Sequence, residues 1–228
     1  MKKYQYLILP ISLFLIFVVF TILVKTLDVH YLSINNTYIG LYTMNHAINT
    51  WIVSYGKMEF SKVVSDVLMY VSFVFVLGYV IAFVIQWFKR KSLKLVDQRY
   101  YLLLGIYALT VIIYVIFELV KVNYAPLFDG ELKSSYPSTH VMVTTIFFTS
   151  SSLVAVDMLS ITKKYLRIIV YVLLGFIALL VGFVRLLSGR HWFSDIIASY
   201  LIFGMVIALF IHAYHIIKER ESNKEELN

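Results

Sequence analysis

Residues 166–217 decide the fold: LRIIVYVLLGFIALLVGFVRLL (166–187), then SGRH (188–191), then WFSDIIASYLIFGMVIALFIHAYHII (192–217). Each apolar run is longer than the roughly 20 residues that a helix needs to cross the hydrocarbon core of a bilayer. Because the polar turn between the runs is very short, the two helices must be antiparallel neighbours. The stretch predicts a helical hairpin that crosses a membrane twice.

The rest of the chain has the same character. Its 228 residues are 61% hydrophobic and 14% charged, with a mean hydropathy of +0.82. A soluble domain is nearer half apolar and a quarter charged. We therefore expect an all-α polytopic membrane protein, with residues 1–228 forming one domain of six transmembrane helices. The spans are expected at 5–26, 65–88, 100–121, 139–160, 166–187 and 192–217.

The first run resembles a signal peptide because it follows Met1-Lys2-Lys3. Its apolar core is too long for one and no small-residue cleavage site follows it, so we interpret it as an uncleaved first span. The chain has no cysteine, which excludes disulfides, thiolate metal sites and a cysteine nucleophile.

The distribution of the basic residues predicts the orientation. Thirteen of the 20 lysines and arginines lie at the N-terminus, in the second and fourth connections, or in the charged tail at about 218–228. The positive-inside rule then places both termini in the cytoplasm and the first, third and fifth connections outside. The cations flank spans and do not form one patch, so a nucleic-acid partner is not expected.

The external connections differ in length. In the longest, 27–62, the stretch 41–51 is either an amphipathic helix lying in the membrane interface or a plain loop. Asp66 follows it and is expected to cap the second span, with a residue of the binding pocket as the alternative. His212 and His215 lie near the cytoplasmic end of the last span and are expected to be interfacial, and no role is assigned to His30 and His46.

Two short blocks on the external side carry reactive side chains. In the second, His191 and Asp195 are four residues apart at the start of a helix and therefore share one face. A carboxylate beside one imidazole nitrogen fixes the tautomer and leaves the other nitrogen free to attack. Arg185 ends the preceding span, and a guanidinium suits phosphate oxygens. These three residues predict attack on a phosphoryl group by histidine.

The first block, Tyr136-Pro137-Ser138-Thr139-His140, begins the fourth span. Backbone N–H groups at a helix N-terminus form an anion site, and the hydroxyl of Ser138 adds a donor. His140 is then placed to protonate a leaving oxygen as a general acid. A metal site is the alternative interpretation of these histidines and carboxylates.

Over about residues 60–217 the chain resembles the type 2 phosphatidic acid phosphatase family, which carries three motifs: K-x6-R-P, P-S-x-H and S-R-x5-H-x3-D. The second motif is Pro137-Ser138-Thr139-His140, and the third runs from Arg185 through His191 to Asp195, with Val184 in place of serine. The resemblance implies that His191 is the nucleophile and forms a phosphohistidine, with Asp195 as its partner and His140 as the acid. It also implies that Arg185, Ser138 and Thr139 hold the phosphate.

The first motif departs from the family pattern. If Pro126 is its proline, Ala125 occupies the arginine position and Glu118 the lysine position. Loss of one charged contact of this kind costs about 3–4 kcal/mol of transition-state stabilisation. The candidate replacements are Lys121, Lys133 in the loop, and Arg190 beside the nucleophile.

The expected protein is an integral membrane phosphatase that hydrolyses a lipid phosphate or pyrophosphate at the outer leaflet, without cofactor or metal. The substrate candidates are a polyprenyl pyrophosphate such as undecaprenyl pyrophosphate, phosphatidylglycerophosphate and phosphatidic acid. The compact chain resembles bacterial members, which points to the plasma membrane. The alternatives are a lipid phosphotransferase of the same fold and a silent lipid-phosphate binder or transporter.

Overall fold

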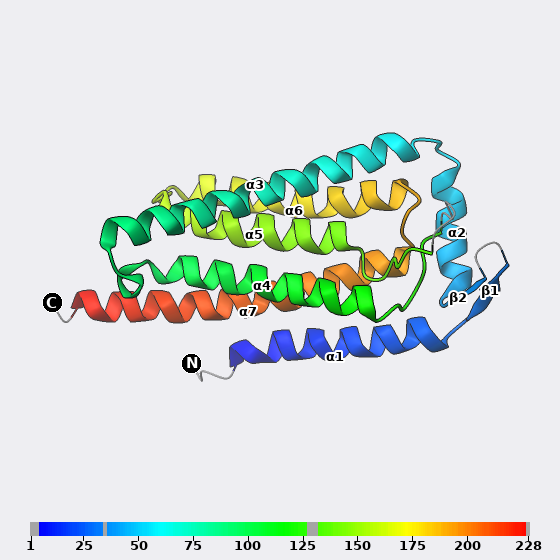
Figure 1. Cartoon of the computed structure of the whole chain (residues 1–228), viewed down its shortest axis with the longest axis horizontal. Coiled ribbons are helices and arrows are strands. Elements are labelled where there is room, and N and C mark those ends of the chain that lie inside the picture. Colours follow the sequence, from blue (N-terminus) through cyan, green and yellow to red (C-terminus); the bar gives the residue numbers. More distant parts are fainter. Residues whose placement is uncertain (1–4, 34–35, 127–131, 227–228) are drawn as a thin grey trace.

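The computed structural model describes residues 5–33, 36–126 and 132–226. Long helices lie side by side in one bundle, and the two ends of the chain lie at the same end of it (Figure 1). The spans are α1 (Gln5–Thr26), α3 (Met58–Arg90), α4 (Gln98–Leu119), α5 (Thr139–Met158), α6 (Lys164–Leu187) and α7 (Phe193–Glu226). Within the described residues, six helices are long and apolar enough to cross a membrane. The prediction of an all-α protein with six transmembrane helices is confirmed.

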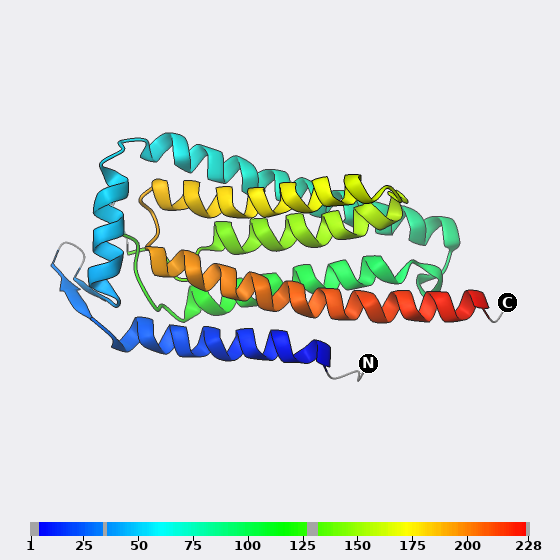
Figure 2. The ribbon, with the colours of Figure 1, turned by 180° about the vertical axis from the view of Figure 1, so that it is seen from behind.

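Helix α5 is the centre of the bundle. In both side views it lies among α3, α4, α6 and α7 (Figures 1 and 2), and it packs against each of them. In its most apolar window 67% of the residues are buried inside the protein, against 6% for α3. Serine and threonine side chains such as Thr145 and Ser150 are accommodated there because they bond backbone carbonyls one turn earlier. The first sequence block, at the start of α5, is therefore held on the most enclosed helix.

Two spans are longer than expected. The break before α3 lies at Gly56, which has a φ of +62°, so the helix begins at Met58 and not at 65. Helix α7 runs to Glu226 and not to 217, because no glycine or proline interrupts 205–226 and its lysines and glutamates are good helix formers. The expected charged tail is thus largely a continuation of α7.

The long connection between α1 and α3 is structured. An antiparallel hairpin, β1 (His30–Leu32) and β2 (Thr37–Ile39), precedes α2 (Tyr42–Val53), which lies across the end of the bundle (Figures 1 and 2). Of the two alternatives for this stretch, the helix is the one observed. Gly40 allows the close approach to α1, since a Cβ there would lie 1.6 Å from the carbonyl oxygen of Val24.

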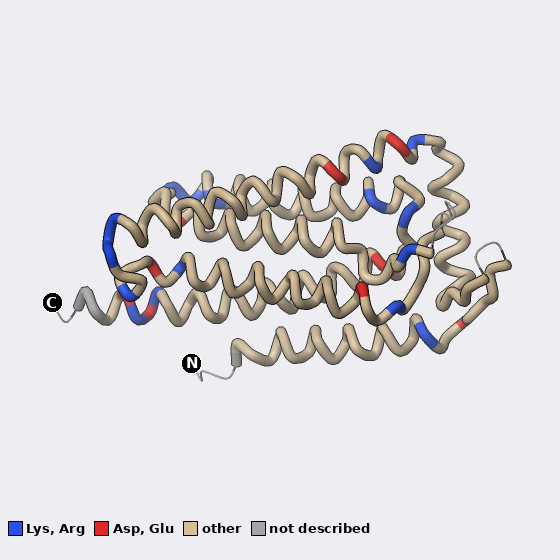
Figure 3. The backbone as a smooth tube through the Cα atoms, in the orientation of Figure 1, with Lys and Arg blue, Asp and Glu red and all other residues tan. Residues whose placement is uncertain are grey.

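Charged residues gather at the two ends of the bundle. At the end that carries the termini, around the 3₁₀ turn η1 (Leu93–Leu95) and the α5–α6 connection, basic residues outnumber acidic ones such as Asp97 and Asp157, and the other end also carries both signs (Figure 3). His212 and His215 lie towards the end with the basic excess, stacked on Tyr6 of α1. The two sequence blocks lie together at the opposite end.

Candidate active site

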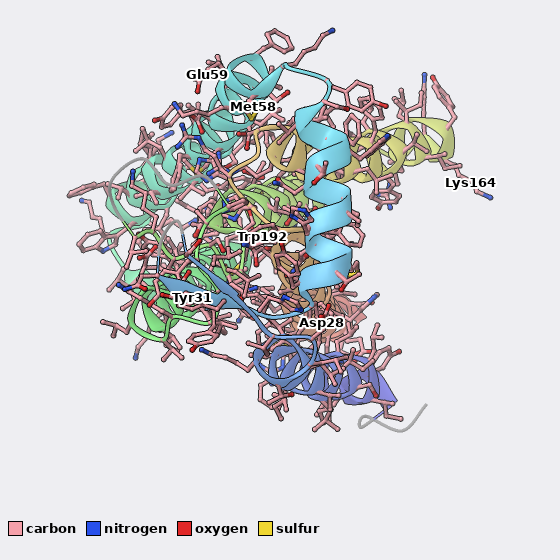
Figure 4. All side chains as sticks on the ribbon, turned by 90° about the vertical axis from the view of Figure 1, so that its right-hand side faces the viewer. Asp28, Tyr31, Met58, Glu59, Lys164 and Trp192 are labelled. Carbon is pink, nitrogen blue, oxygen red and sulfur yellow. The ribbon has the colours of Figure 1, made fainter. Side chains whose placement is uncertain are left out.

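The turn between α6 and α7 holds His191 in place. Gly189 has a φ of +65°, a conformation that favours glycine and lets the chain reverse within four residues. The carboxylate of Asp195 accepts a hydrogen bond from the backbone N–H of Trp192 at 2.9 Å, which caps the first turn of α7. In the end view Trp192 lies near the centre, next to α2, whereas Met58 and Glu59 mark the start of α3 (Figure 4). Asp195, fully buried, thus anchors the turn as well as facing the histidine.

The imidazole of His191 has a defined orientation. Its Nδ1 lies 2.8 Å from the carbonyl oxygen of Ser135 and 3.7 Å from Oδ2 of Asp195. A carbonyl can only accept, so Nδ1 carries the hydrogen and Nε2 keeps its lone pair. Sequence reasoning expected Asp195 to orient the ring; the shorter contact goes to Ser135, with the carboxylate alongside.

Burial holds the pKa of His191 below its ordinary value of 6.5, and the nearby charge of Arg185 acts in the same direction. The nearby carboxylate of Asp195 opposes this shift of the pKa. The ring is therefore neutral at neutral pH, which is the form that can attack.

His140 and Arg185 meet at one carboxylate. Oδ1 of Asp66 lies 2.9 Å from Nε2 of His140 and 3.5 Å from Nη1 of Arg185. Nη1 of Arg185 also donates to the hydroxyl of Ser65 at 3.2 Å. The expectation that Asp66 caps the second span is wrong, because α3 begins eight residues earlier and Asp66 faces α5 and α6 from its third turn. Its signal in the sequence was a carboxylate within an apolar run.

A cavity of about 700 Å³ lies beside His140, Arg185 and His191. Its polar end is lined by Thr139, His140, Arg185 and His191, four residues of the predicted site. Lys121, Lys133 and Glu118 line the same cavity. Deeper in the bundle its walls are apolar and come from three helices: Met69, Phe73, Val111, Val143 and Phe147.

Other candidates lie elsewhere. Ser138 is fully buried behind Thr139, and its N–H is bonded to the backbone carbonyl of Asp195 at 3.2 Å. Arg190 does not line the cavity and instead pairs with Glu59 at 3.7 Å. His30 and His46 stack on Tyr42 at the outer end of the molecule, away from the cavity.

The loop before α5 places a lysine opposite the altered first motif. Tyr124 and Ser134 form an isolated antiparallel bridge, and the N–H of Ala125 donates to the carbonyl of Lys133 at 3.0 Å. Lys133 therefore sits across from Ala125 and, unlike Ala125, lines the cavity. Nε1 of Trp192 donates to the carbonyl of Tyr124 at 2.7 Å, which ties this loop to the His191 turn. The stretch 127–131 of this loop lies outside the described residues.

Several buried donors lack a hydrogen-bond partner among the described residues, and two of them, Nε of Arg185 and the hydroxyl of Ser138, belong to residues of the predicted site. Buried donors are nearly always satisfied, and their exceptions need an explanation. For Arg185, which lines a cavity together with lysines and imidazoles, a bound anion would supply one. The same part of the chain holds no cluster of three or more histidine and carboxylate side chains suited to a metal ion.

Comparison with known proteins agrees with this geometry. A comparison with curated protein sequences gives no match. Among solved structures, the chain is similar to a transmembrane PAP2-type phosphatidylglycerolphosphate phosphatase from Bacillus subtilis, with 20% identity and a TM-score of 0.61 over 94% of this chain and 96% of that one. The family model of the PAP2 superfamily matches residues 68–220, which include α5, α6 and both histidine blocks. The chain therefore belongs to the PAP2 superfamily and has the fold of its membrane phosphatases.

Proposed function

We propose that the protein hydrolyses a lipid phosphomonoester or pyrophosphate through a phosphohistidine on His191. One observation carries the proposal: the imidazole of His191, whose Nδ1 contacts Ser135 and whose Nε2 has no hydrogen-bond partner among the described residues, shares a cavity with Arg185 and His140. The guanidinium is a permanent charge, and in a site shielded from water it stabilises the charge that develops on phosphoryl oxygens.

The chemistry follows from the positions of the groups. Nε2 of His191 attacks phosphorus, and the bond from phosphorus to the lipid oxygen breaks. His140, across the cavity, donates a proton to that leaving oxygen. A water then attacks the phosphohistidine, His140 takes its proton, and inorganic phosphate leaves with His191 restored. Asp195 holds the turn and offsets the positive charge on the ring during the transfer.

The shape of the cavity favours a lipid. Its polar end is at the end of the bundle, and its apolar walls continue into the depth expected for the hydrocarbon region. Phe73 and Val111 line the cavity and are also exposed on the surface of the bundle, 44% and 52%. An acyl or prenyl chain can therefore leave the cavity directly into surrounding lipid while its phosphate reaches His191.

The charge division between the two ends favours a site on the outer side of the membrane. The basic end, with both termini, then faces the cytoplasm. In a bacterial plasma membrane this places hydrolysis at the outer leaflet.

The test is phosphate release by the purified protein in detergent from phosphatidic acid, phosphatidylglycerophosphate and a polyprenyl pyrophosphate. At least one should be hydrolysed, and His191→Ala should lose turnover and the acid-labile phosphoenzyme while eluting as a folded protein. Added alcohol acceptors distinguish the transferase alternative, which would yield a new phosphoester in place of phosphate. Binding of these lipids without release or transfer by the unmodified protein would support the silent binder and contradict the proposal.

A further inference from the structure

We propose that Asp66 is a positioning residue that makes His140 an effective proton donor, so that the site contains a second histidine–carboxylate pair beside His191 and Asp195. The inference rests on the proposed function, because a general acid needs a leaving group. Asp66 lies outside all three family motifs quoted above and precedes the region that the family model matches.

The contacts of the carboxylate support this role. Its Oδ1 lies 2.9 Å from Nε2 of His140, which is within hydrogen-bond distance. A carboxylate accepts, so Nε2 of the imidazole carries a hydrogen towards it. Nδ1 is then the nitrogen left to deliver a proton to a substrate. The arrangement resembles that of His191, where Nδ1 is engaged and Nε2 is left for the phosphorus.

Asp66 lies behind the reactive groups and does not compete with the phosphate. His140, Arg185 and His191 all line the cavity, whereas Asp66 does not. Its other oxygen, Oδ2, lies 3.7 Å from Nζ of Lys62 one turn earlier, and Lys62 does not line the cavity either. A carboxylate in the phosphate position would have to be displaced by substrate; one behind the imidazole stays in place and stabilises the imidazolium before it gives up its proton.

The same carboxylate is the counterion of a buried charge. The side chain of Arg185 is 8% exposed, and its contacts on α3 are Asp66 and Ser65. A buried guanidinium without a partner is costly, so loss of Asp66 disturbs both Arg185 and His140. Ser65 contacts Arg185, and its other hydrogen bond goes to the backbone carbonyl of Lys62 and not to His140, so it provides a matched control for that part of the effect.

The chemistry of the leaving group separates the effect on proton donation by His140 from the effect on phosphate binding by Arg185. An alkyl phosphate expels a strongly basic oxygen that needs a proton, whereas a nitrophenyl phosphate with the same alkyl tail expels a stable phenolate that does not. The readout is kcat/KM for each, which reports the steps up to phosphoenzyme formation. The alkyl-to-aryl ratio of kcat/KM isolates protonation, since weaker phosphate binding lowers both values alike.

Asp66→Asn should lower the alkyl-to-aryl ratio by on the order of 10²-fold, the lower range for a general acid. Ser65→Ala should lower kcat/KM for both substrates by the same factor and leave the alkyl-to-aryl ratio unchanged. Asp66→Glu should recover part of the ratio, and in a His140→Asn background Asp66→Asn should change it no further.

An unchanged ratio in Asp66→Asn, with the protein folded and the aryl substrate still turned over, would overturn the proposal. So would a further loss of the ratio in the His140→Asn background. Failure of the proposed function is a different result: the unmodified protein would hydrolyse neither substrate.

Discussion

Asn45 is expected to hold α2 to the start of the nucleophile helix, and its loss should destabilise the protein. Its side chain is fully buried. Its Nδ2 donates to the carbonyl of Gly40 and to the hydroxyl of Ser194, both at 3.0 Å, and its Oδ1 accepts from the N–H of Ser194 at 3.0 Å. The last contact satisfies one of the N–H groups that the first turn of any helix leaves unpaired.

Asn45→Ala removes all three hydrogen bonds and leaves the N–H of Ser194 and the carbonyl of Gly40 buried without them. Each buried group left unsatisfied costs about 1–3 kcal/mol, which gives roughly 2–6 kcal/mol for the two groups. For a chain of this length, about 2–4 °C of Tm accompanies each kcal/mol, so Tm should fall by roughly 4–24 °C. Turnover should fall as well, because Asp195 is the next residue along the chain.

The assay is thermal unfolding in one detergent at one scan rate, followed by tryptophan fluorescence. Ser194→Ala is the matched control, since it removes the hydroxyl contact but keeps the backbone N–H bonded to Asn45, and should shift Tm by less than about 5 °C. If Asn45→Ala lowers Tm no more than Ser194→Ala does, the cap is not energetically coupled to the fold and the reasoning fails.

Three further predictions concern chemistry and orientation. Because burial depresses the pKa of His191 and its neutral form attacks, kcat/KM should stay high down to pH 6.5 and fall only below it; an acidic limb centred above 7 would contradict this. Lys133→Ala should lower kcat/KM about tenfold to a thousandfold through loss of a phosphate contact, whereas Arg190→Ala, paired with Glu59 away from the cavity, should change it less than about threefold; the opposite order would show that Arg190 holds the phosphate. The chain has no cysteine of its own, so single cysteines introduced at exposed Tyr55 and exposed Leu93 report on the orientation. The one at Tyr55 should react with an impermeant thiol reagent on intact cells and the one at Leu93 should not; the reversed labelling pattern would show the opposite orientation.

The six spans could be predicted because run length alone separates membrane helices from buried ones. The central place of α5 could also have been inferred. Its apolar window has the lowest hydropathy of the six, 1.6, and it is interrupted by residues such as Thr144 and Ser151. A helix that is too polar to face lipid on all sides is stable when other helices surround it.

The partners of the two histidines were harder to predict, for two different reasons. Asp66 carried a signal, but a span expected to begin at 65 made it a terminal residue, and the true start at Met58 puts it inside the helix. The carbonyl of Ser135 carried none, because a backbone acceptor 56 residues from His191 leaves no trace in residue types. Side-chain chemistry can be inferred from a sequence, whereas a backbone contact between distant segments depends on the folded path of the loop.

The altered first motif shows how the site can keep its charge while its motif changes. The family pattern puts two cations on and just after the third span, where this chain has Glu118 and Ala125. Two lysines, Lys121 and Lys133, line the cavity from the loop that follows. The same loop is tied to the nucleophile turn by the bond from Trp192 to Tyr124. If these lysines hold the phosphate, the loop backbone, and not the third helix, fixes the position of the phosphate relative to His191. A change of residue type on that helix then need not remove the activity.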